Sequence, residues 1–499
     1  MDLTDFTGML SGWIWNDFMV WACLGLGLFF TIRFGAPQVT RVRDMVYYLV
    51  HGEKSAQGTS SFQSFSMALA GRIGTGAIAG VATAIFWGGP GAVFWMWMIG
   101  ILGAATAFCE ATLAQIFKEE VAGEYRGGPA FYIEKGLGKN FTWLAILFAI
   151  LAVISKSICE GPVQANAISS AMREAFDIPE WVTGVVVAAL LAFIIFGGMR
   201  RIATFAELVV PFMTLGYVIV LFIVLVANAP AVPGMFVLIF ANAFGLDPLF
   251  GGLLGYAVLW GVKRGVYSSE AGLGTGGQAA AAAEVSHPVK QGLAQSFSVY
   301  CDIILAATST ALMILVTGCY NVSDHADGAI RSSLPGTTAG PEYTQHAVDT
   351  VLPGFGPKFV AIALMFFAFT TIVSFAFYGD TNAAFLFRKH PKYYKIAQNA
   401  VKALLILSVG YGAIAKSDVV WNMADIGVGA NVWVNLIGIT LLSGTAAKAM
   451  KDFKRQRKLK LDPVFDPDAL GIKNAELWKR IIPEKFSHLV AANEASDPS

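Results

Sequence analysis

The sequence predicts an all-α polytopic membrane protein, and composition, run length and helix-breaking glycines are the observations that predict it. Of the 499 residues, 56% are hydrophobic and only 14% are charged, and the mean hydropathy is +0.60. A soluble chain would carry about a quarter charged residues. The net charge of +1 gives no reason to expect nucleic acid as a partner. The expected partner is therefore a lipid bilayer.

Hydrophobic runs long enough to cross a bilayer recur along the chain. A transmembrane helix needs about 20 consecutive apolar residues, and about eleven runs meet this length. The first lacks the basic start and the small-residue cleavage site of a signal peptide, so we expect it to be a retained span. The expected spans are residues 13–33, 64–87, 89–117, 141–172, 180–198, 206–228, 250–284, 292–317, 357–387, 395–414 and 419–447.

The distribution of Lys and Arg predicts one orientation. Cytoplasmic loops carry an excess of these residues. If the N-terminus lies outside, the basic residues fall in cytoplasmic segments. These are Arg41 and Arg43 after the first run, Arg388 and Lys389 after the ninth, and the basic segment after the last. We therefore expect the N-terminus outside and the C-terminus inside, with residues 449–499 as a charged cytoplasmic tail.

Two of the runs contain their own helix breakers. Residues 68–88 read ALAGRIGTGAIAGVATAIFWG, and residues 263–277 read KRGVYSSEAGLGTGG. The second of these segments begins five spans after the first. Because five is an odd number, the two broken helices cross the membrane in opposite directions. This arrangement is typical of an inverted repeat of five plus five spans. The expected organisation is an extra N-terminal helix and loop (1–60), a first repeat (61–228), a second repeat with outer loops (229–448) and the tail (449–499).

Broken helices in a membrane point to a binding site. Backbone groups at membrane depth must find partners, so an unwound turn lines a polar cavity. Free N–H groups attract a carboxylate and free carbonyls attract a cation. Two facing breaks can therefore hold a zwitterion and a metal ion. The alternative is that the glycines only allow close helix packing, but two matched breaks, each with buried charges, favour the site.

Several other function classes lack their sequence signals. The six histidines fall in loops or in the tail and HExxH is absent, which argues against a metalloenzyme, and we expect no enzyme activity. A channel would need a filter loop or constriction, and no repeated filter loop is visible. The phosphate-binding pattern GxxxxGK[ST] is also absent. An ion gradient is therefore the expected energy source of a transporter. No disulfide framework is expected from the five cysteines.

Longer motifs carry a resemblance to a known family. GRIGTGAIAGVATAIFWGGPGAVFWMW (71–97), GEYRGGPAFYIEKGLG (123–138), VQANAI (163–168), WGVKRGVYSSEAGLG (260–274) and VWNMADI (420–426) resemble, in order, segments of the alanine or glycine:cation symporter family, also called the sodium:alanine symporter family. The resemblance covers residues from about 60 to 445.

The resemblance implies a fold and a function. The fold would be that of the leucine transporter (LeuT), which agrees with the inverted repeat. The activity would be symport of a small neutral amino acid with a sodium ion across the plasma (bacterial inner) membrane by alternating access. Sodium would be the coupling ion, with no other cofactor. The alternative is a proton-coupled or uncoupled amino-acid transporter of altered specificity, for example for glutamine or serine.

The resemblance also implies a substrate site around the two breaks. Backbone N–H groups near Thr75 would hold the substrate carboxylate. Each side chain has a structural alternative: the hydroxyl of Thr75 could bond to its own helix, the amide of Gln164 could join helices, and Tyr267 could belong to the core. The implied substrate-binding residues are Thr75, Gly76, Ala77, Gln164, Tyr267, Ser268, Ser269, Gly272, Thr371 and Phe375.

A sodium site is implied beside the first break. The hydroxyls of Thr370 and Thr371 would join the carbonyls of Ala70 and Ile73 around the ion. Such an all-oxygen set suits a hard cation. The alternative for the two threonines is that each hydroxyl bonds back to its own helix.

The sequence departs from the family pattern at three places in the pocket. Ala77 stands where asparagine is usual, Ser269 follows Ser268 where asparagine is usual, and Phe375 stands where tryptophan is usual. Ala77 offers no side-chain oxygen, so we expect one sodium ion per substrate, without a second ion site.

Buried charges flank both breaks, and a charge at membrane depth must have a partner. We expect Lys263, Arg264 and Glu270 to form structural ion pairs rather than to contact substrate. We expect Arg72 to pair with a carboxylate or to line an inner vestibule.

Overall fold

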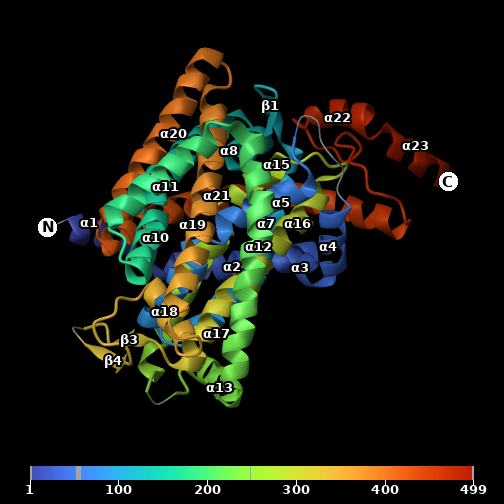
Figure 1. Cartoon of the computed structure of the whole chain (residues 1–499). Coiled ribbons are helices and arrows are strands. Elements are labelled where there is room, and N and C mark those ends of the chain that lie inside the picture. The colour runs from blue at the N-terminus through green and yellow to red at the C-terminus, as the bar shows by residue number, and fades with distance from the viewer. Residues whose placement is uncertain (1–2, 52–57, 248, 327, 497–499) are drawn as a thin grey trace.

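The computed structural model describes residues 3–51, 58–247, 249–326 and 328–496. Helices make up nearly all of this part of the chain, and two short β-hairpins are its sheets. Figure 1 shows a bundle of long helices that are packed together at different tilts. The all-helical membrane architecture predicted from the sequence is confirmed at this level.

Eight helical stretches in the described ranges are long and apolar enough to cross a membrane, and a bent pair makes a ninth. The bent pair joins α5 (Ser61–Arg72) to a π-helical turn, η1 (Gly76–Gly80), and α6 (Val81–Gly88), with a bend of 50°. The eight stretches are α2 (Asp17–Phe34), α7 (Ala92–Ile116), Lys139–Phe176, Arg201–Ala227 of α12 (Gly198–Ala227), Pro288–Thr317, α19 (Gly356–Phe387), α20 (Pro391–Ile414) and α21 (Ser417–Lys458).

Two of the eleven predicted spans do not appear as long helices. The run at 180–198 forms α11 (Glu180–Ile195), whose 16 residues span only about 24 Å. The run at 250–284 is divided between α14 (Leu254–Ser269) and α15 (Thr275–Ala281). The other nine runs coincide with the eight stretches and the bent pair, so the structure supports eight or nine spans by length.

Two of the long stretches contain π-helical turns, in which the helix holds an extra residue. Lys139–Phe176 consists of η2 (Lys139–Phe141), α9 (Thr142–Ile154), the π segment η3 (Ser155–Cys159) and α10 (Gly161–Phe176). Pro288–Thr317 consists of α16 (Pro288–Tyr300), the π segment η6 (Cys301–Ala307) and α17 (Thr308–Thr317). With η1, the described chain therefore has three π segments, all inside apolar stretches.

Local sequence explains where helices begin and end. The side chain of Asn16 accepts a hydrogen bond from the N–H of Met19 at the start of α2, and Gly35 ends that helix in the left-handed conformation. Ser60 and Gln63 form a reciprocal capping box at the start of α5. These capping residues therefore mark the ends of the helices α2 and α5.

The remaining elements are short and lie mostly toward the two ends of the bundle. One end carries β3 and β4, α13 and α18, and the other carries β1, α8 and α22 (Figure 1). Their bounds are α1 (Leu3–Ile14), α3 (Pro37–Thr40), α4 (Val42–Val50), β1 (Glu119–Val121), β2 (Glu124–Arg126), α8 (Pro129–Leu137), η4 (Ala229–Ala231), α13 (Val232–Ala243), η5 (Gly251–Leu253), β3 (Asn321–Ser323), β4 (Ala329–Ser332), α18 (Pro341–Asp349), α22 (Leu477–Lys485) and α23 (Ser487–Ser496).

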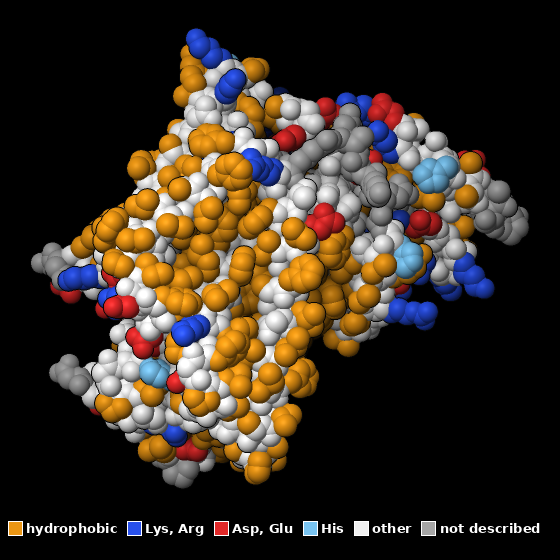
Figure 2. All heavy atoms as spheres, in the orientation of Figure 1, with side chains coloured by type: hydrophobic (Ala, Val, Ile, Leu, Met, Phe, Trp, Pro, Cys, Tyr) orange, Lys and Arg blue, Asp and Glu red, His pale blue; other side chains and the backbone are white. Residues whose placement is uncertain are grey.

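The outer surface of the bundle is apolar. Figure 2 shows hydrophobic side chains gathered over the central part of one face, across α11 and α12. Phe193, Phe212 and Phe222 are all more than half exposed there. A soluble protein rarely exposes so large an apolar face, so this surface fits a hydrocarbon environment.

Helix α7 lies at the centre and packs closely against α14 and α16. Small residues make this approach possible. A Cβ added at Gly265 would lie 2.3 Å from the Cγ2 of Ile99, and one added at Gly261 would lie 2.5 Å from the carbonyl oxygen of Ala92. This close contact between α7 and α14 fixes the position of the second break.

The C-terminal segment after α21 packs onto the end of α7. Trp478 is fully buried, and its indole N–H donates to the carbonyls of Gln115 at 3.0 Å and Ile116 at 3.2 Å. Lys290 forms an ion pair of 2.6 Å with Asp462. The predicted division of the chain into repeats and tail stays a prediction.

We predict that Trp478→Ala destabilises the protein because it removes a buried ring and leaves two carbonyls at the end of α7 without their donor. The expected loss is about 3–5 kcal/mol of unfolding free energy, measured as a lower melting temperature in detergent. Trp181→Ala is the matched control, since Trp181 is 64% exposed and its loss opens no cavity. Equal melting temperatures for the two variants would contradict this role of the tail.

Candidate functional site

The first break lies between α5 and η1, at Ile73, Gly74 and Thr75. The N–H of Thr75 donates to the Oε1 of Gln164 on α10 at 2.9 Å, so a side chain from another helix caps the second half-helix. The Nε2 of Gln164 in turn donates to the hydroxyl of Tyr267 on α14 at 3.2 Å. A single amide therefore joins both broken helices.

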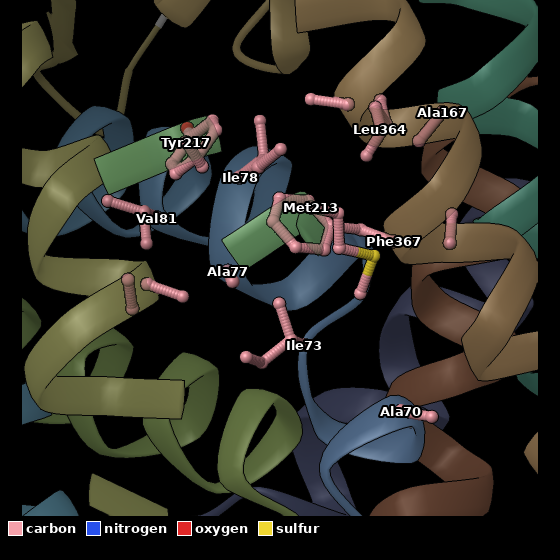
Figure 3. Close-up of a cluster of buried hydrophobic side chains, with 14 of the residues drawn as sticks. Ala70, Ile73, Ala77, Ile78, Val81, Ala167, Met213, Tyr217, Leu364 and Phe367 are labelled. Atoms are coloured by element: carbon pink, nitrogen blue, oxygen red, sulfur yellow. The ribbon is translucent and has the colours of Figure 1, made fainter. Parts of the chain in front are cut away.

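Apolar side chains surround the far side of this break. Figure 3 shows Ile73, Ala77 and Ile78 of the first broken helix beside Met213 of α12 and Phe367 of α19. All five are buried or nearly so. The first broken helix thus has an apolar side toward α12 and α19 and a polar side toward Gln164 and α14.

The second break covers Glu270 to Gly274 and follows α14. Three residues take positive φ values: Glu270 (+51°), Gly272 (+97°) and Gly274 (+85°). The side chain of Asn435 on α21 donates to the carbonyl of Gly272 at 2.8 Å and to the Oε1 of Glu110 at 2.6 Å. Asn435 therefore satisfies a carbonyl that the break leaves without a helical partner.

The two breaks touch each other. A Cβ added at Gly76 would lie 2.9 Å from the Cα of Ser268, so only glycine allows this approach. Backbone N–H groups at the start of η1 therefore lie beside the end of α14. This is the juxtaposition that the sequence predicted from its two glycine-rich segments.

Arg72 links the first broken helix to the second. Its Nε donates to the carbonyl of Ser269 at 2.6 Å. Its Nη1 donates to the backbone and side-chain oxygens of Gln295 at 3.3 and 3.2 Å and also to Ser298. The expectation that Arg72 pairs with a carboxylate or lines a vestibule is wrong, because it is 1% exposed and these acceptors are neutral oxygens of the second break and α16.

A buried ion-pair cluster stands at the second break. Lys156 of η3 lies 2.7 Å from Glu160 and 2.8 Å from Glu270. The other oxygen of Glu270 accepts from the hydroxyl of Thr275 at 2.8 Å. The ammonium of Lys156 also lies 4.5 Å from the ring centre of Phe375. The expectation of a structural ion pair for Glu270 is confirmed.

A second ion cluster involves α14 and α21. Lys263 and Arg264 lie 2.7 and 2.8 Å from the two oxygens of Asp425, which confirms the expected pairing of these two cations. The guanidinium of Arg264 lies 4.3 Å from the ring centre of Trp421, and Trp421 packs against Tyr267 at 5.2 Å between centroids.

A cavity of about 570 Å³ opens above the second ion cluster. Its lining includes Trp87, Trp260, Arg264 and Trp421. Because Trp421 packs against Tyr267, this cavity is separated from the hydrogen-bonded pair of Gln164 and Tyr267 by the ring of Trp421.

Hydroxyls of α19 face the carbonyls of α5. The Oγ1 of Thr371 donates to the carbonyl of Ala70 at 2.8 Å and lies 3.0 Å from that of Phe367. The Oγ1 of Thr370 donates to the carbonyl of Phe367 within its own helix, at 2.9 Å. Thr371 and Ala70 are therefore in contact, as the predicted sodium site requires. Thr370 instead bonds back to its own helix, which is the alternative given for it from the sequence.

The oxygen set near Thr371 fits a hard cation better than a transition metal. It offers hydroxyl and carbonyl oxygens, the donors that such cations prefer. In the described residues, no group of three or more His, Cys, Asp or Glu side chains could hold a metal ion. A Cβ at Gly74 would lie 2.3 Å from the Oγ1 of Thr371, so the break passes directly beside this hydroxyl.

The other predicted site residues have the following positions. Thr75 is fully buried, and its hydroxyl has no hydrogen-bond partner, so it does not bond back to its helix. The carbonyl of Ala77 accepts from Thr310 at 2.6 Å. The hydroxyl of Ser268 donates to the Oδ1 of Asp302 at 3.0 Å.

Several polar residues of this region were not found from the sequence. Asp302, Asp425 and Asn435 each contact a residue of the second broken helix. A signal existed for Asp302, since an acidic residue inside an apolar run is costly and is usually functional. Asn435 and Asp425 gave a weaker signal, because they lie in the long α21 among other polar residues.

Comparisons with a family model and with related sequences point to the same family. A family model described as the sodium:alanine symporter family matches residues 1–467. YrbD of Bacillus subtilis (strain 168) is 50% identical over 479 residues, which cover 96% of this chain and 98% of that protein. A sodium/proton-dependent alanine carrier protein of Bacillus sp. (strain PS3) is 47% identical over 436 residues, covering 87% and 97% of the two chains.

Solved structures also match, and one of them is a metal-ion transporter. A crystal structure of a manganese transporter mutant of Eremococcus coleocola aligns with a TM-score of 0.44 and 12% identity, over 87% of this chain and 93% of the other.

We predict that Gly276→Ala destabilises the protein through Arg72. The new Cβ would lie 2.3 Å from the Nη2 of Arg72, and the hydrogen bonds of the guanidinium prevent it from moving away. Overpacking of this kind costs about 1–3 kcal/mol, which a melting curve in detergent detects. Gly255→Ala on α14 is the control, because nothing lies within 4 Å of its Cβ. A Gly276→Ala protein as stable as the Gly255→Ala protein would show that Arg72 is not held in place.

Proposed function

Because the chain belongs to the sodium:alanine symporter family, we propose that it carries a small neutral amino acid, alanine or glycine, across the plasma membrane together with sodium. The transport would proceed by alternating access in a leucine-transporter fold of five plus five spans. The N-terminus would lie outside and the C-terminus in the cytoplasm. The observation that carries this proposal is the contact of the two breaks at Gly76 and Ser268.

The substrate carboxylate would bind at the start of the second half of the first broken helix. Backbone N–H groups there, from Thr75 to Ile78, form the positive end of a helix dipole. In the present arrangement the amide oxygen of Gln164 accepts from the N–H of Thr75. A carboxylate oxygen makes the same kind of hydrogen bond with higher strength, so substrate would compete with Gln164 for this donor.

The charges around the site support a neutral substrate. Lys156 balances Glu270 and Glu160, and Asp425 is held by Lys263 and Arg264. Because each of these carboxylates already has a cationic partner, none of them favours the binding of a substrate with a cationic side chain. Phe375 and Tyr267 would bound the side-chain end of the pocket, with Ser269 and Gly272 in the second break.

Sodium would bind between α5 and α19. Thr371 would supply its hydroxyl oxygen, and Ala70 and Ile73 their carbonyls. The hydroxyl proton of Thr371 can point to the carbonyl of Phe367 at 3.0 Å, which frees an oxygen lone pair for the ion. Ala77 contributes no side-chain oxygen, which supports one sodium per substrate.

The second candidate is coupling to protons or a changed specificity, for example for glutamine or serine. The altered pocket residues Ala77, Ser269 and Phe375 favour it, and one relative is named a sodium/proton-dependent alanine carrier.

The test is uptake of labelled alanine by the full-length protein in proteoliposomes, with an inward sodium gradient and a panel of competing amino acids. We expect sodium-stimulated uptake that glycine inhibits and lysine and arginine do not. Gly76→Ala should abolish uptake, because its Cβ would meet the backbone of Ser268 at 2.9 Å. Gly80→Ala should retain uptake, because its nearest neighbours lie at 3.8 Å. Inhibition by lysine as strong as by glycine would reject the proposed substrate class.

We predict that the two neighbouring threonines differ in their effect on sodium dependence. Thr371→Val removes the hydroxyl that faces Ala70, and the sodium concentration for half-maximal uptake should rise at least tenfold. Thr370→Val removes a hydroxyl bonded within its own helix and should leave that concentration near the wild-type value. The measurement is uptake against sodium concentration at fixed pH, with a Hill coefficient near 1 expected for the wild type. A stronger effect at Thr370 would overturn the assignment.

A further inference from the structure

Asp302 is a buried carboxylate that faces the site from the π segment η6. It is fully buried, and its Oδ1 accepts from the hydroxyl of Ser268 at 3.0 Å. Its Oδ2 has no hydrogen-bond partner. A π segment inside a helix is often a functional position, and η6 packs directly against η1.

The other buried carboxylates around the second break are more fully engaged. Glu270 binds Lys156 with one oxygen and Thr275 with the other. Glu160 binds Ser155 and Lys156, and Asp425 binds two cations. Glu110 resembles Asp302 in having one oxygen without a partner, but its Oε1 belongs to the Asn435 clamp on Gly272. Asp302 differs from all of them because its only hydrogen bond comes from a proposed substrate-site residue.

The charged groups that act on Asp302 do not neutralise it directly. They are Arg72 of α5 and Glu270 after α14, of opposite sign. The Nε and Nη1 of Arg72 donate to Ser269, Gln295 and Ser298, and its Nη2 has no hydrogen-bond partner. On α12, Tyr217 is bonded to Thr310; on α7, Glu110 is bonded to Asn435.

The charged groups of α14 and α16, which also pack against η6, have partners elsewhere. On α14, Lys263 and Arg264 pair with Asp425 and Tyr267 accepts from Gln164. On α16, Lys290 pairs with Asp462 and Tyr300 donates to the carbonyl of Gln38.

The segments η1 and α17 carry no titratable side chain, and the one within η6 besides Asp302 is the thiol of Cys301. An ionised carboxylate is costly in such surroundings, and the Oδ2 of Asp302, which has no hydrogen-bond partner, is the atom on which a proton would remove that cost.

Asp302 is linked to the proposed substrate site through a single residue, Ser268. Asp302 holds the hydroxyl of Ser268, and Ser268 lies against Gly76 at the start of the second half-helix. When the carboxylate ionises, both oxygens become acceptors, which strengthens the hydrogen bond from Ser268. The position of Ser268 against Gly76 therefore depends on whether Asp302 carries a proton.

We propose that Asp302 is the group that takes up and releases a co-transported proton, in addition to the sodium site at Thr371. This inference rests on the proposed transport function. The step balances as a proton transfer: an O–H bond of a hydronium ion on one side breaks as the O–H bond of the carboxyl group forms, which leaves water. On the other side the carboxyl O–H bond breaks and a water molecule becomes hydronium. A sodium ion would need several further oxygen ligands, whereas a proton needs only one carboxylate oxygen.

The experiment compares two modes of transport in proteoliposomes. Counterflow of labelled alanine against unlabelled alanine, at equal pH and with equal sodium on both sides, needs substrate binding but no net proton movement. Accumulation driven by an imposed pH gradient, acid outside and with equal sodium on both sides, needs the proton site. The Asp302→Asn variant keeps an oxygen that accepts from Ser268 but cannot titrate. It should lose gradient-driven accumulation at least tenfold and keep at least half of the counterflow.

Glu110→Gln is the matched control, because it also removes a fully buried carboxylate with one unpartnered oxygen. It should keep both modes of transport. Retained pH-driven accumulation in Asp302→Asn, its loss in Glu110→Gln instead, or its absence in the wild type would each overturn the proton assignment. Loss of counterflow together with accumulation in Asp302→Asn would also overturn it, by making Asp302 a substrate anchor. No counterflow of alanine in the wild type would instead reject the proposed function itself.

A labelling measurement on the wild type does not depend on any variant. Dicyclohexylcarbodiimide reacts with protonated carboxyl groups in apolar surroundings, and mass spectrometry identifies the modified residue. We expect labelling at Asp302 that increases at lower pH and a parallel loss of pH-driven accumulation. Inhibition without modification of Asp302 would contradict the proposal.

Discussion

The hydrogen bonds of the buried Arg72 guanidinium are the interaction on which the rest of the site depends. They tie the end of α5 to the carbonyl of Ser269 and to α16, so separating the two broken helices would leave buried guanidinium N–H groups without acceptors. Gly276 provides the space for this side chain. An arginine has the rigid fork of donors that such a bridge needs, which a lysine lacks.

The polar groups of the interior serve two different purposes. Gln164, Asn435 and Arg72 satisfy backbone groups that the breaks leave without helical partners, as a low-dielectric interior demands. The clusters at Lys156 and at Asp425 balance their own charges. Asp302 belongs to neither group, and for this reason it stands out as a functional carboxylate.

The sequence predicted the positions of the breaks because glycines next to charges disfavour a continuous helix inside an apolar run. Family resemblance assigned Gln164 and Tyr267 to one substrate site, and Thr371 and Ala70 to one sodium site. The structure shows a hydrogen bond between Gln164 and Tyr267 and another between Thr371 and Ala70. The sequence could not find the partners of Arg72 or Lys263, because these contacts join residues about 160 to 230 positions apart. Length supports eight or nine of the eleven predicted spans, because hydropathy does not reveal that α11 has only 16 residues or that α14 ends at Ser269.

The three π segments have a consequence for how this architecture tolerates length changes. A π segment accommodates one residue more than a regular helix, and one residue corresponds to a rotation of about 100° around the helix axis. Deleting a single residue within η1, η3 or η6 would restore a regular helix but would turn every side chain on one flank away from its present neighbour. Lys156 and Asp302 lie in such segments. Related chains can therefore differ here by single-residue gaps that change which groups face the site, while the hydrophobic run looks unaltered.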